Sequence, residues 1–282
     1  MPTIYFSEFA VLLKPNWYTD ISSGAAKLGY GVSRKEKYES ITSKDVLILW
    51  NRHLEQDALA KKFEAVGAKV LILENAYIKQ TGQWISVGIG YHNNIKHSIP
   101  CMDEGQRFES FGIEIKPWRT AGKHILYASQ SHIFNARGLG LGEYASPAGF
   151  DLGVLKEIRK HTNRTIHCRL HPKCKMLPEL PTGIYSSHGK FKTMEEDLAE
   201  AWATVVWTSN AATESLLAGV PVFVSGPSVF ASDACNISLE SLEDPVLPDN
   251  RLEIFRRMAW SQYNRAECQS GFFLKTILDN IT

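Results

Sequence analysis

The chain has 282 residues, 44% of them hydrophobic and 22% charged, and its 31 Lys and Arg nearly balance its 30 Asp and Glu. This composition is typical of a folded globular protein, and it excludes intrinsic disorder and a fibrous architecture. The formal net charge of +1 excludes a field over the whole molecule that would attract nucleic acid or an anionic membrane, but it is compatible with a local basic patch.

Length, cysteine usage and hydropathy set further expectations. At roughly 100–200 residues per domain the chain is long enough for two domains, with one large domain as the alternative. The 5 cysteines are odd in number, far apart and free of C-x-x-C spacing, which argues against a disulfide framework or a structural zinc site. A strand-like segment begins at residue 3 without a signal peptide before it, and no stretch of about 18 residues is continuously apolar. We therefore expect a cytoplasmic protein without integral membrane association.

Short apolar runs alternate with helical patterns through most of the chain, which predicts βαβ units, mainly parallel sheets and the α/β class. The first complete unit has a strand at residues 45–50, an amphipathic helix at 54–66 that ends at Gly67, and a strand at 69–73. Residues 84–94 are rich in glycine and polar side chains.

A second series of units begins after an extended crossing segment at residues 111–118. The predicted elements are a strand at 124–128, a glycine-rich loop at 138–149, a helix at 152–161, strands at 165–170 and 183–185, a helix at 194–203, a strand at 204–207, a helix at 211–218 and a strand at 220–224. We place the boundary near residue 120. Residues 1–120 then form an N-terminal Rossmann-like domain and residues 121–282 a C-terminal one, whose helix-rich end at 251–281 is expected to pack back across the first domain.

One strand is followed by small polar residues that suit an anion. The apolar strand ends in Thr208, Ser209 and Asn210, which cap a helix whose free N–H groups and positive dipole would face a phosphate. Glu214 falls one turn inside the helix, where its carboxylate can accept hydrogen bonds from a ribose or from the loop. The alternative is an ordinary capping arrangement of Ser209 with Glu214.

A second polar strand end carries Arg169, His171 and Lys173 at alternating positions. Two cations and an imidazole suit a phosphate, and α/β proteins bind ligands at the carboxyl ends of their strands. The alternative is a solvated basic turn. In the first half, Glu74 ends a predicted strand and is a candidate catalytic carboxylate, against the alternative of a capping or surface glutamate. His92 belongs to a group of hydrogen-bonding residues that is equally compatible with a tight turn.

Several of these segments resemble the donor-binding signature of nucleotide-sugar transferases with two Rossmann-like domains, the GT-B fold. Among them the chain is most similar to the capsule polysaccharide synthesis family that contains bacterial Kdo transferases. The matching residues are Thr208-Ser209, Glu214-Ser-Leu-Leu-Ala-Gly219, Pro221-Val222 and Gly226-Pro-Ser-Val-Phe-Ala231, with the last loop shortened, and the His-Pro motif in Cys168-Arg-Leu-His-Pro-Lys173. A weaker match is Leu73-Glu-Asn-Ala-Tyr-Ile78, where Asn75 and Ala76 replace an acidic residue and a glycine.

The resemblance implies a glycosyltransferase whose two domains face each other across a cleft. A nucleotide-sugar would be the co-substrate, with no other cofactor, and it would lie on the second domain. The residues expected to bind it are Gln130, Arg169, Lys173, His188, Thr208, Ser209, Asn210 and Glu214. The catalytic candidates are Glu74, His92 and His171, with Glu74 or His92 as base. No D-x-D motif is present, so we expect no metal, and the glycines form neither a Walker loop nor a dinucleotide fingerprint.

The sequence is compatible with two chemical classes of acceptor. The family resemblance implies a glycan or lipid-linked saccharide. Residues 260–271, however, look like compact virus-encoded members that modify hydroxymethylated pyrimidines in DNA, as in a bacteriophage acting in its host cytoplasm. Arg251, Arg256, Arg257 and Arg265 would then form a local DNA-binding patch, with a solvated helix face as the alternative. A non-catalytic nucleotide or glycan-binding module and a UDP-sugar epimerase are the competing functions, and the oligomeric state is open.

Overall fold

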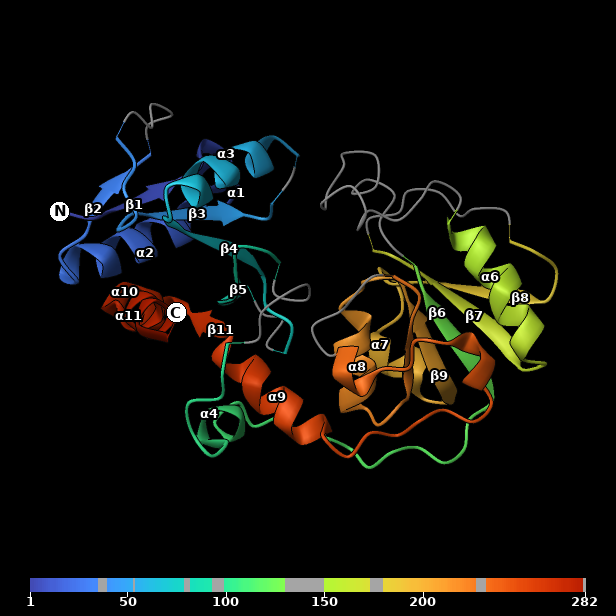
Figure 1. The fold of residues 1–282 in the computed structure, drawn as a ribbon. Coiled ribbons are helices and arrows are strands. Elements are labelled where there is room, and N and C mark those ends of the chain that lie inside the picture. Colours follow the sequence, from blue (N-terminus) through green and yellow to red (C-terminus); the bar gives the residue numbers. More distant parts are fainter. Residues whose placement is uncertain are drawn as a thin grey trace. The chain divides into compact units, whose positions relative to one another are not determined.

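The computed structural model describes residues 1–34, 40–52, 54–78, 82–92, 99–129, 150–172, 180–226 and 232–280. The chain divides into two compact α/β units (Figure 1). The first consists of Met1–Phe111 together with Arg256–Thr282, and the second of Gly112–Phe255. This division differs from the expected one at residue 120, because the last 27 residues, from 256 to 282, belong to the first unit.

A six-stranded sheet forms the centre of the first unit, in the order β11-β5-β4-β3-β1-β2. Its strands are β1 (Thr3–Phe6), β2 (Gly31–Ser33), β3 (Val46–Trp50), β4 (Lys69–Asn75), β5 (Trp84–Ile89) and β11 (Gln262–Asn264). The helices are α1 (Glu8–Leu13), α2 (Pro15–Lys27), α3 (Leu54–Ala65), α4 (Gln106–Glu109), α9 (Arg251–Trp260), in which the unit boundary falls, α10 (Arg265–Ser270) and α11 (Phe272–Asn280). Strands β1 to β4 are parallel and β5 is antiparallel to β4. The predicted unit of two strands and a helix at residues 45–73 is confirmed.

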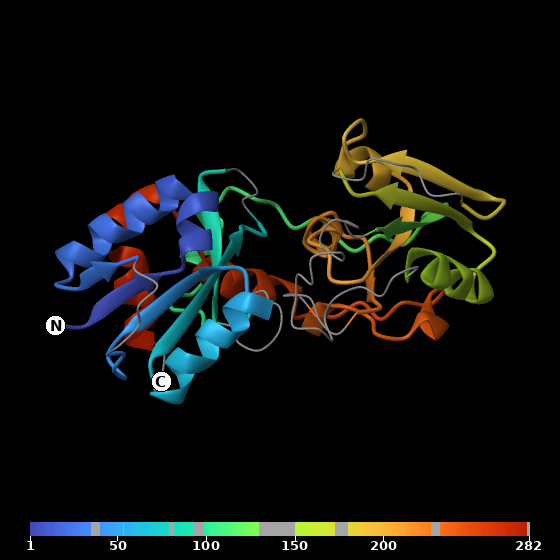
Figure 2. The ribbon, with the colours of Figure 1, turned by 90° about the horizontal axis from the view of Figure 1, so that it is seen from above.

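Helices cover both faces of this sheet (Figure 2), and the side chains of the central strands pack alternately against the two layers. In β3, Ile48 and Trp50 pack in the same cluster as the apolar residues of α2 and α11. The intervening Leu47 and Leu49 pack with Phe63 of α3 on the other side. Because successive side chains of a strand point to opposite faces, a continuous apolar run indicates a strand covered on both sides.

The end of the chain completes the first unit. β11 pairs antiparallel with β5, with Tyr263 opposite Ile85, and α10 and α11 pack against α2. The contact between α2 and α10 is so close that a Cβ on Gly24 would lie 2.1 Å from the backbone oxygen of Cys268. The C-terminal helices therefore pack back as expected, but they do so as part of the first unit, since β11 extends its sheet.

A five-stranded parallel sheet forms the second unit, in the order β10-β9-β6-β7-β8. Its strands are β6 (His124–Ala128), β7 (Thr165–Leu170), β8 (Ile184–His188), β9 (Ala201–Val206) and β10 (Val222–Val224), and its helices are α6 (Phe150–His161), α7 (Met194–Leu198) and α8 (Ala211–Leu217), with 3-10 turns at Ser232–Ala234 and Leu239–Ser241. From β6 the chain builds outward through β7 and β8, and it then returns to the other side of β6 for β9 and β10. The strand order thus reverses between β6 and β9, and ligands of open α/β sheets bind at such a point.

One predicted element is wrong and others were missed. The helix expected at residues 194–203 ends at Leu198, and β9 begins at Ala201, because Ala203 pairs with Ile125 of β6. This strand pairing joins segments far apart in sequence, so local periodicity does not reveal it. Residues 8–33, for which no element was predicted, form α1, α2 and β2. Within the described ranges, no helix combines the length and apolar character needed to cross a membrane.

Candidate functional site

Small polar residues gather at the point where the strand order of the second sheet reverses. Ser129 follows β6, and Thr208, Ser209 and Asn210 lie between β9 and α8. The Ala211 N–H donates to Ser209 Oγ at 3.3 Å, whereas the side chain of Asn210, the residue at the cap position, makes no capping bond. Ser209 therefore satisfies one amide at the start of α8. Glu214 lies at the fourth residue of α8 and is half-buried.

The backbone around the glycine that ends this motif leaves no room for a side chain. Gly219 has a φ of +75°, and a Cβ there would lie 2.0 Å from the backbone oxygen of Pro117. The crossing segment runs along the end of α8, where the Lys116 N–H donates to Leu217 O and the Arg119 N–H to Gly219 O, both at 2.8 Å. A side chain at position 219 would therefore push this segment away.

Arg169 has a partner that the sequence analysis did not foresee. Its guanidinium forms an ion pair with the buried carboxylate of Asp197 and donates to Lys192 O at 2.8 Å. Asp197 also accepts from Ser187 Oγ at 2.9 Å and pairs with Lys192 Nζ at 2.6 Å. Burial raises the pKa of Asp197, but hydrogen bonds from Lys192, Arg169 and Ser187 outweigh it, so the net pKa is lowered. The structure thus gives Arg169 a partner within the chain, and its expected contact with a donor phosphate stays a prediction.

The two remaining described histidine candidates of the second unit lie at strand ends. His171 directly follows β7, and its backbone N–H donates to Ser129 Oγ at 3.4 Å, which joins the ends of β7 and β6. His188 is the last residue of β8, and its Nδ1 accepts the Lys190 N–H at 3.1 Å, so the neutral ring carries its proton on Nε2. Gln130 and Lys173 lie outside the described residues.

In the first unit the structure brings together the two predicted catalytic residues. Glu74 lies near the carboxyl end of β4, and its Oε1 is 2.9 Å from Nδ1 of His92. The hydroxyl of Tyr77, which the sequence analysis did not select, donates to Glu74 Oε2 at 2.5 Å. The backbone N–H of Arg52, just after β3, donates to Nε2 of His92 at 3.1 Å. The carboxylate is thus held between a phenol and an imidazole.

These contacts define the protonation of the cluster. Nε2 of His92 accepts an N–H, so in the neutral ring Nδ1 carries the proton and donates to Glu74. Burial lowers the pKa of His92, but the Glu74 carboxylate outweighs it, so the net pKa is raised. Burial and the same carboxylate raise the pKa of Tyr77 well above its usual value. Tyr77 therefore stays protonated as a donor, and Glu74 is held as an oriented carboxylate between two hydrogen-bond donors.

Arg52 anchors the turn that carries His92. Its side chain is almost completely buried and pairs with Asp57 at 2.8 Å and with Glu64 at 2.6 Å. The guanidinium also donates to Gly90 O and lies 4.8 Å from the ring centre of Tyr91. The sequence signal for this role is an arginine two residues after the apolar run at residues 46–50.

The stability of the second unit should fall as the solution is acidified below about pH 6.5, where free histidine gains its proton. The rings of His124 and His167 stack at 3.9 Å, and Nε2 of His124 lies 3.0 Å from Asp197 O. Burial lowers the pKa of both rings, with a further contribution to His124 from His167 and to His167 from Lys192. The unfolded chain therefore binds more protons as the pH falls, which favours unfolding. Urea denaturation at pH 7.5 and 5.5 should show a smaller acid loss for His167→Gln than for the wild type, and an equal loss would contradict this.

Among the described residues, no three His, Cys, Asp or Glu side chains are grouped so that they would hold a metal ion.

No protein-family model matches the chain, and no curated protein sequence matches it either. Among solved structures, the chain is similar to the beta Kdo 2,7 transferase of KpsC from Thermosulfurimonas dismutans, with 18% identity, a TM-score of 0.57, and coverage of 98% of this chain and 99% of that chain. It is also similar to the beta Kdo 2,4 transferase of KpsC from the same organism, with 12% identity, a TM-score of 0.57, and coverage of 92% and 90%.

At these identities the likeness establishes the fold. The chain is an α/β protein of the GT-B architecture, with two Rossmann-like units, as the sequence predicted. The first unit departs from a purely parallel sheet, because β5 and the returning strand β11 form an edge with antiparallel pairing.

Proposed function

We propose that this protein is a glycosyltransferase that moves a sugar from a nucleotide-sugar donor to an acceptor hydroxyl. The observation that carries the proposal is the carboxyl edge of the second sheet. There Ser129, the polar residues 208–210 and the start of the segment at His171 lie where the strand order reverses. This is the place at which Rossmann-like sheets bind nucleotides, and the polar groups there suit a phosphate.

The donor would bind to the second unit. Ser209, Thr208 and Asn210 would bind the phosphates beside the N–H groups at the start of α8, and Glu214 the ribose. Gln130, Lys173 and His188 complete the proposed donor contacts, with Arg169 acting through the loop whose carbonyl groups it binds. Protein groups would then neutralise the phosphates without a metal ion, in keeping with the lack of a D-x-D motif.

The acceptor hydroxyl would be deprotonated by the first unit. Glu74 would take the proton as the oxygen attacks the anomeric carbon, and the bond from that carbon to the donor phosphate would break. His92 and Tyr77 orient Glu74. His171 would stabilise the charge on the leaving phosphate in the second unit.

A glycan is the acceptor class that the contacts favour over hydroxymethylated DNA. Of the four arginines considered for a DNA patch, Arg251 is buried, donates to Leu216 O at 2.9 Å and lies 3.8 Å from the ring centre of Trp118. Arg265 forms an ion pair with the buried Asp20 at 2.5 Å. Arg251 is therefore withdrawn from solvent, and Arg265, although 36% exposed, is already paired within the chain, which leaves neither guanidinium as an unpaired charge for a DNA phosphate. We propose that the enzyme acts on a glycan in the cytoplasm and keep a DNA acceptor of a virus-encoded enzyme as an outcome of the test.

A nucleotide screen tests the proposal directly. We expect one of CMP, UDP and GDP, or its sugar conjugate, to raise the melting temperature, because a ligand that binds the folded state stabilises it. Ser209→Ala should lower the affinity for that nucleotide about 2- to 10-fold, since it removes one hydrogen-bonding group. Ser238→Ala is the matched control, because Ser238 Oγ also accepts a backbone N–H at 3.3 Å, in the same unit but in a 3-10 turn.

The products distinguish the competing functions. Mass spectrometry of candidate glycans and of hydroxymethylated DNA should show the mass of one sugar added to a glycan. Nucleotide release without a glycosylated product would indicate hydrolysis, a changed sugar with the nucleotide still attached would indicate an epimerase, and binding without turnover would indicate a binding module. The transferase proposal is wrong if no nucleotide changes the melting temperature.

A further inference from the structure

The last strand of the chain touches the loop beside Glu74. Gln262 is the first residue of β11 and its side chain is fully buried. Its Oε1 accepts the backbone N–H groups of Tyr77 and Ile78, both at 2.8 Å. A carbonyl oxygen has two lone pairs, and here both are used to hold one short stretch of backbone more than 180 residues earlier in the chain.

Strand register places Gln262 and Glu74 on the same face of the sheet. Gln262 lies opposite Ser86 of β5, and Ser86 lies opposite Glu74 of β4. Directly opposed residues of neighbouring strands point to the same face, so the three side chains form a row across β11, β5 and β4. Gln262 thus reaches the loop after β4 from the far end of the row in which Glu74 stands.

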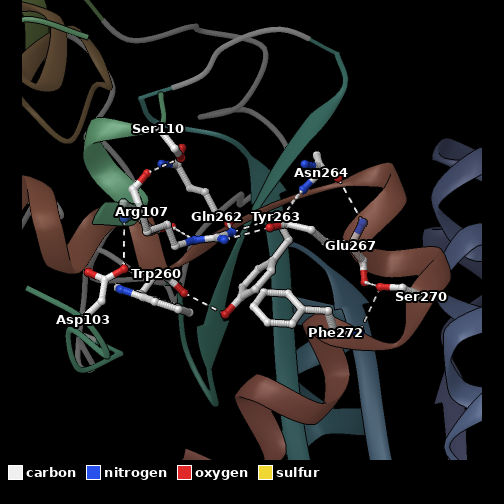
Figure 3. Close-up of polar contacts among 11 residues, drawn as sticks. Asp103, Arg107, Ser110, Trp260, Gln262, Tyr263, Asn264, Glu267, Ser270 and Phe272 are labelled. Carbon is white, nitrogen blue, oxygen red and sulfur yellow. Dashed lines mark hydrogen bonds and ion pairs between the residues drawn. The ribbon is translucent and has the colours of Figure 1, made fainter. Parts of the chain in front are cut away.

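A charged cluster holds Gln262 in turn (Figure 3). Arg107 donates to Gln262 O at 2.5 Å and forms a bidentate pair with Glu267, at 2.7 and 3.1 Å. The guanidinium also lies 5.0 Å from the ring centres of both Trp260 and Tyr263. A bidentate, stacked arginine allows little movement, so β11 provides a fixed support for the loop at residues 76–78.

We propose that Gln262 is a positioning residue for Glu74. It fixes the backbone of residues 76–78 so that the Tyr77 hydroxyl donates to Glu74 Oε2. The catalytic meaning of this arrangement rests on the proposed function, in which Glu74 is the base. Gln262 itself would touch neither donor nor acceptor, and its effect would pass through Tyr77.

Three variants separate this role from a general contribution to stability. Gln262→Leu removes the acceptor of both N–H groups, and Tyr77→Phe removes the hydroxyl alone. Gln269→Leu is the control, because Gln269 lies on the same returning segment but its amide donates to Asp20 of α2, at 2.6 Å. Should Gln262→Leu fail to fold, Gln262→Asn replaces it, since the shorter side chain keeps the amide but draws its oxygen back from the loop.

A double-mutant cycle measures the coupling. Tyr77→Phe should lower kcat roughly 10- to 100-fold with little change in KM, since it removes a hydrogen bond to a charged group. Gln262→Leu should lower kcat comparably, and the double variant should be no worse than Tyr77→Phe alone. Losses that multiply in the double variant, or an equal loss in Gln269→Leu, would overturn the proposal.

A second measurement does not depend on any enzymatic activity. The His92 ring titrates beside Glu74, so a displaced carboxylate changes its pKa, which NMR can follow once His92→Gln identifies the resonance. Gln262→Leu and Tyr77→Phe should shift this pKa in the same direction, and Gln269→Leu should leave it unchanged. An unchanged His92 pKa in Gln262→Leu would overturn the positioning role even if glycosyl transfer is shown. The expected shift in a protein without transferase activity would instead uphold the arrangement and reject the function.

Discussion

Replacing Glu74 by Gln should lower kcat by about 10²–10⁴-fold while the protein stays folded. The amide has the size of the carboxylate but cannot take a proton from the acceptor hydroxyl. Its NH₂ group would also face one of the two donors, Tyr77 or His92, that now bind the carboxylate oxygens. The measurement is steady-state turnover with the donor and acceptor found in the nucleotide screen, together with a thermal melt that checks the fold.

Control variants distinguish the effect of losing a negative charge from the effect of losing the catalytic base. Glu109→Gln removes one negative charge from the same unit at a carboxylate that is 68% exposed, and it should keep wild-type turnover. His92→Gln should cost less than Glu74→Gln, because His92 orients the base in our proposal. The reverse order would make His92 the base, and wild-type turnover in Glu74→Gln would remove Glu74 from the catalytic step.

Replacing Asp197 by Ala should destabilise the second unit by about 3–5 kcal/mol. The carboxylate is fully buried, and without it Arg169, whose side chain is only 13% exposed, keeps its charge without a counter-charge. Lys192 is 39% exposed and can turn into water, so most of the loss should come from Arg169. Urea denaturation, analysed with separate transitions for the two units, measures the loss.

The stability difference between the wild type and Asp197→Ala should shrink as the pH falls. The folded-state pKa of Asp197 is lowered, so its contribution is present above the usual carboxyl pKa and is lost as the pH falls through the lowered value. Wild type and Asp197→Ala should therefore converge in stability at acid pH. Asp279→Ala is the control, because its pair with Lys275 is exposed and should change stability by no more than about 0.5 kcal/mol. A loss below about 1 kcal/mol for Asp197→Ala would show that Arg169 does not depend on this partner, and would favour direct binding of the donor phosphate by Arg169.

The sequence by itself determined the parts of the fold that depend on neighbouring residues. The strand at residues 165–170 and the unit at 45–73 were predicted within a few residues, because buried strands and amphipathic helices reveal themselves by their local pattern. The helix predicted over residues 194–203 failed where β9 pairs with β6, which lies more than 70 residues earlier. The membership of residues 256–282 in the first unit likewise depends on the pairing of β11 with β5.

The same division applies to the candidate site. Glu74 was selected because it ends a predicted strand, and His92 because it belongs to a group of hydrogen-bonding residues. Their contact at 2.9 Å required the tertiary fold. The sequence marked Arg169 as a cation at a strand end and could not show that Asp197, 28 residues later, would bind it. The support that Gln262 gives to residue 77 joins segments that lie 185 residues apart in the sequence. Local patterns determine which residues are candidates, whereas ion pairs and hydrogen bonds between distant segments form only when the chain folds. Only the tertiary structure therefore decides which partners the candidates have.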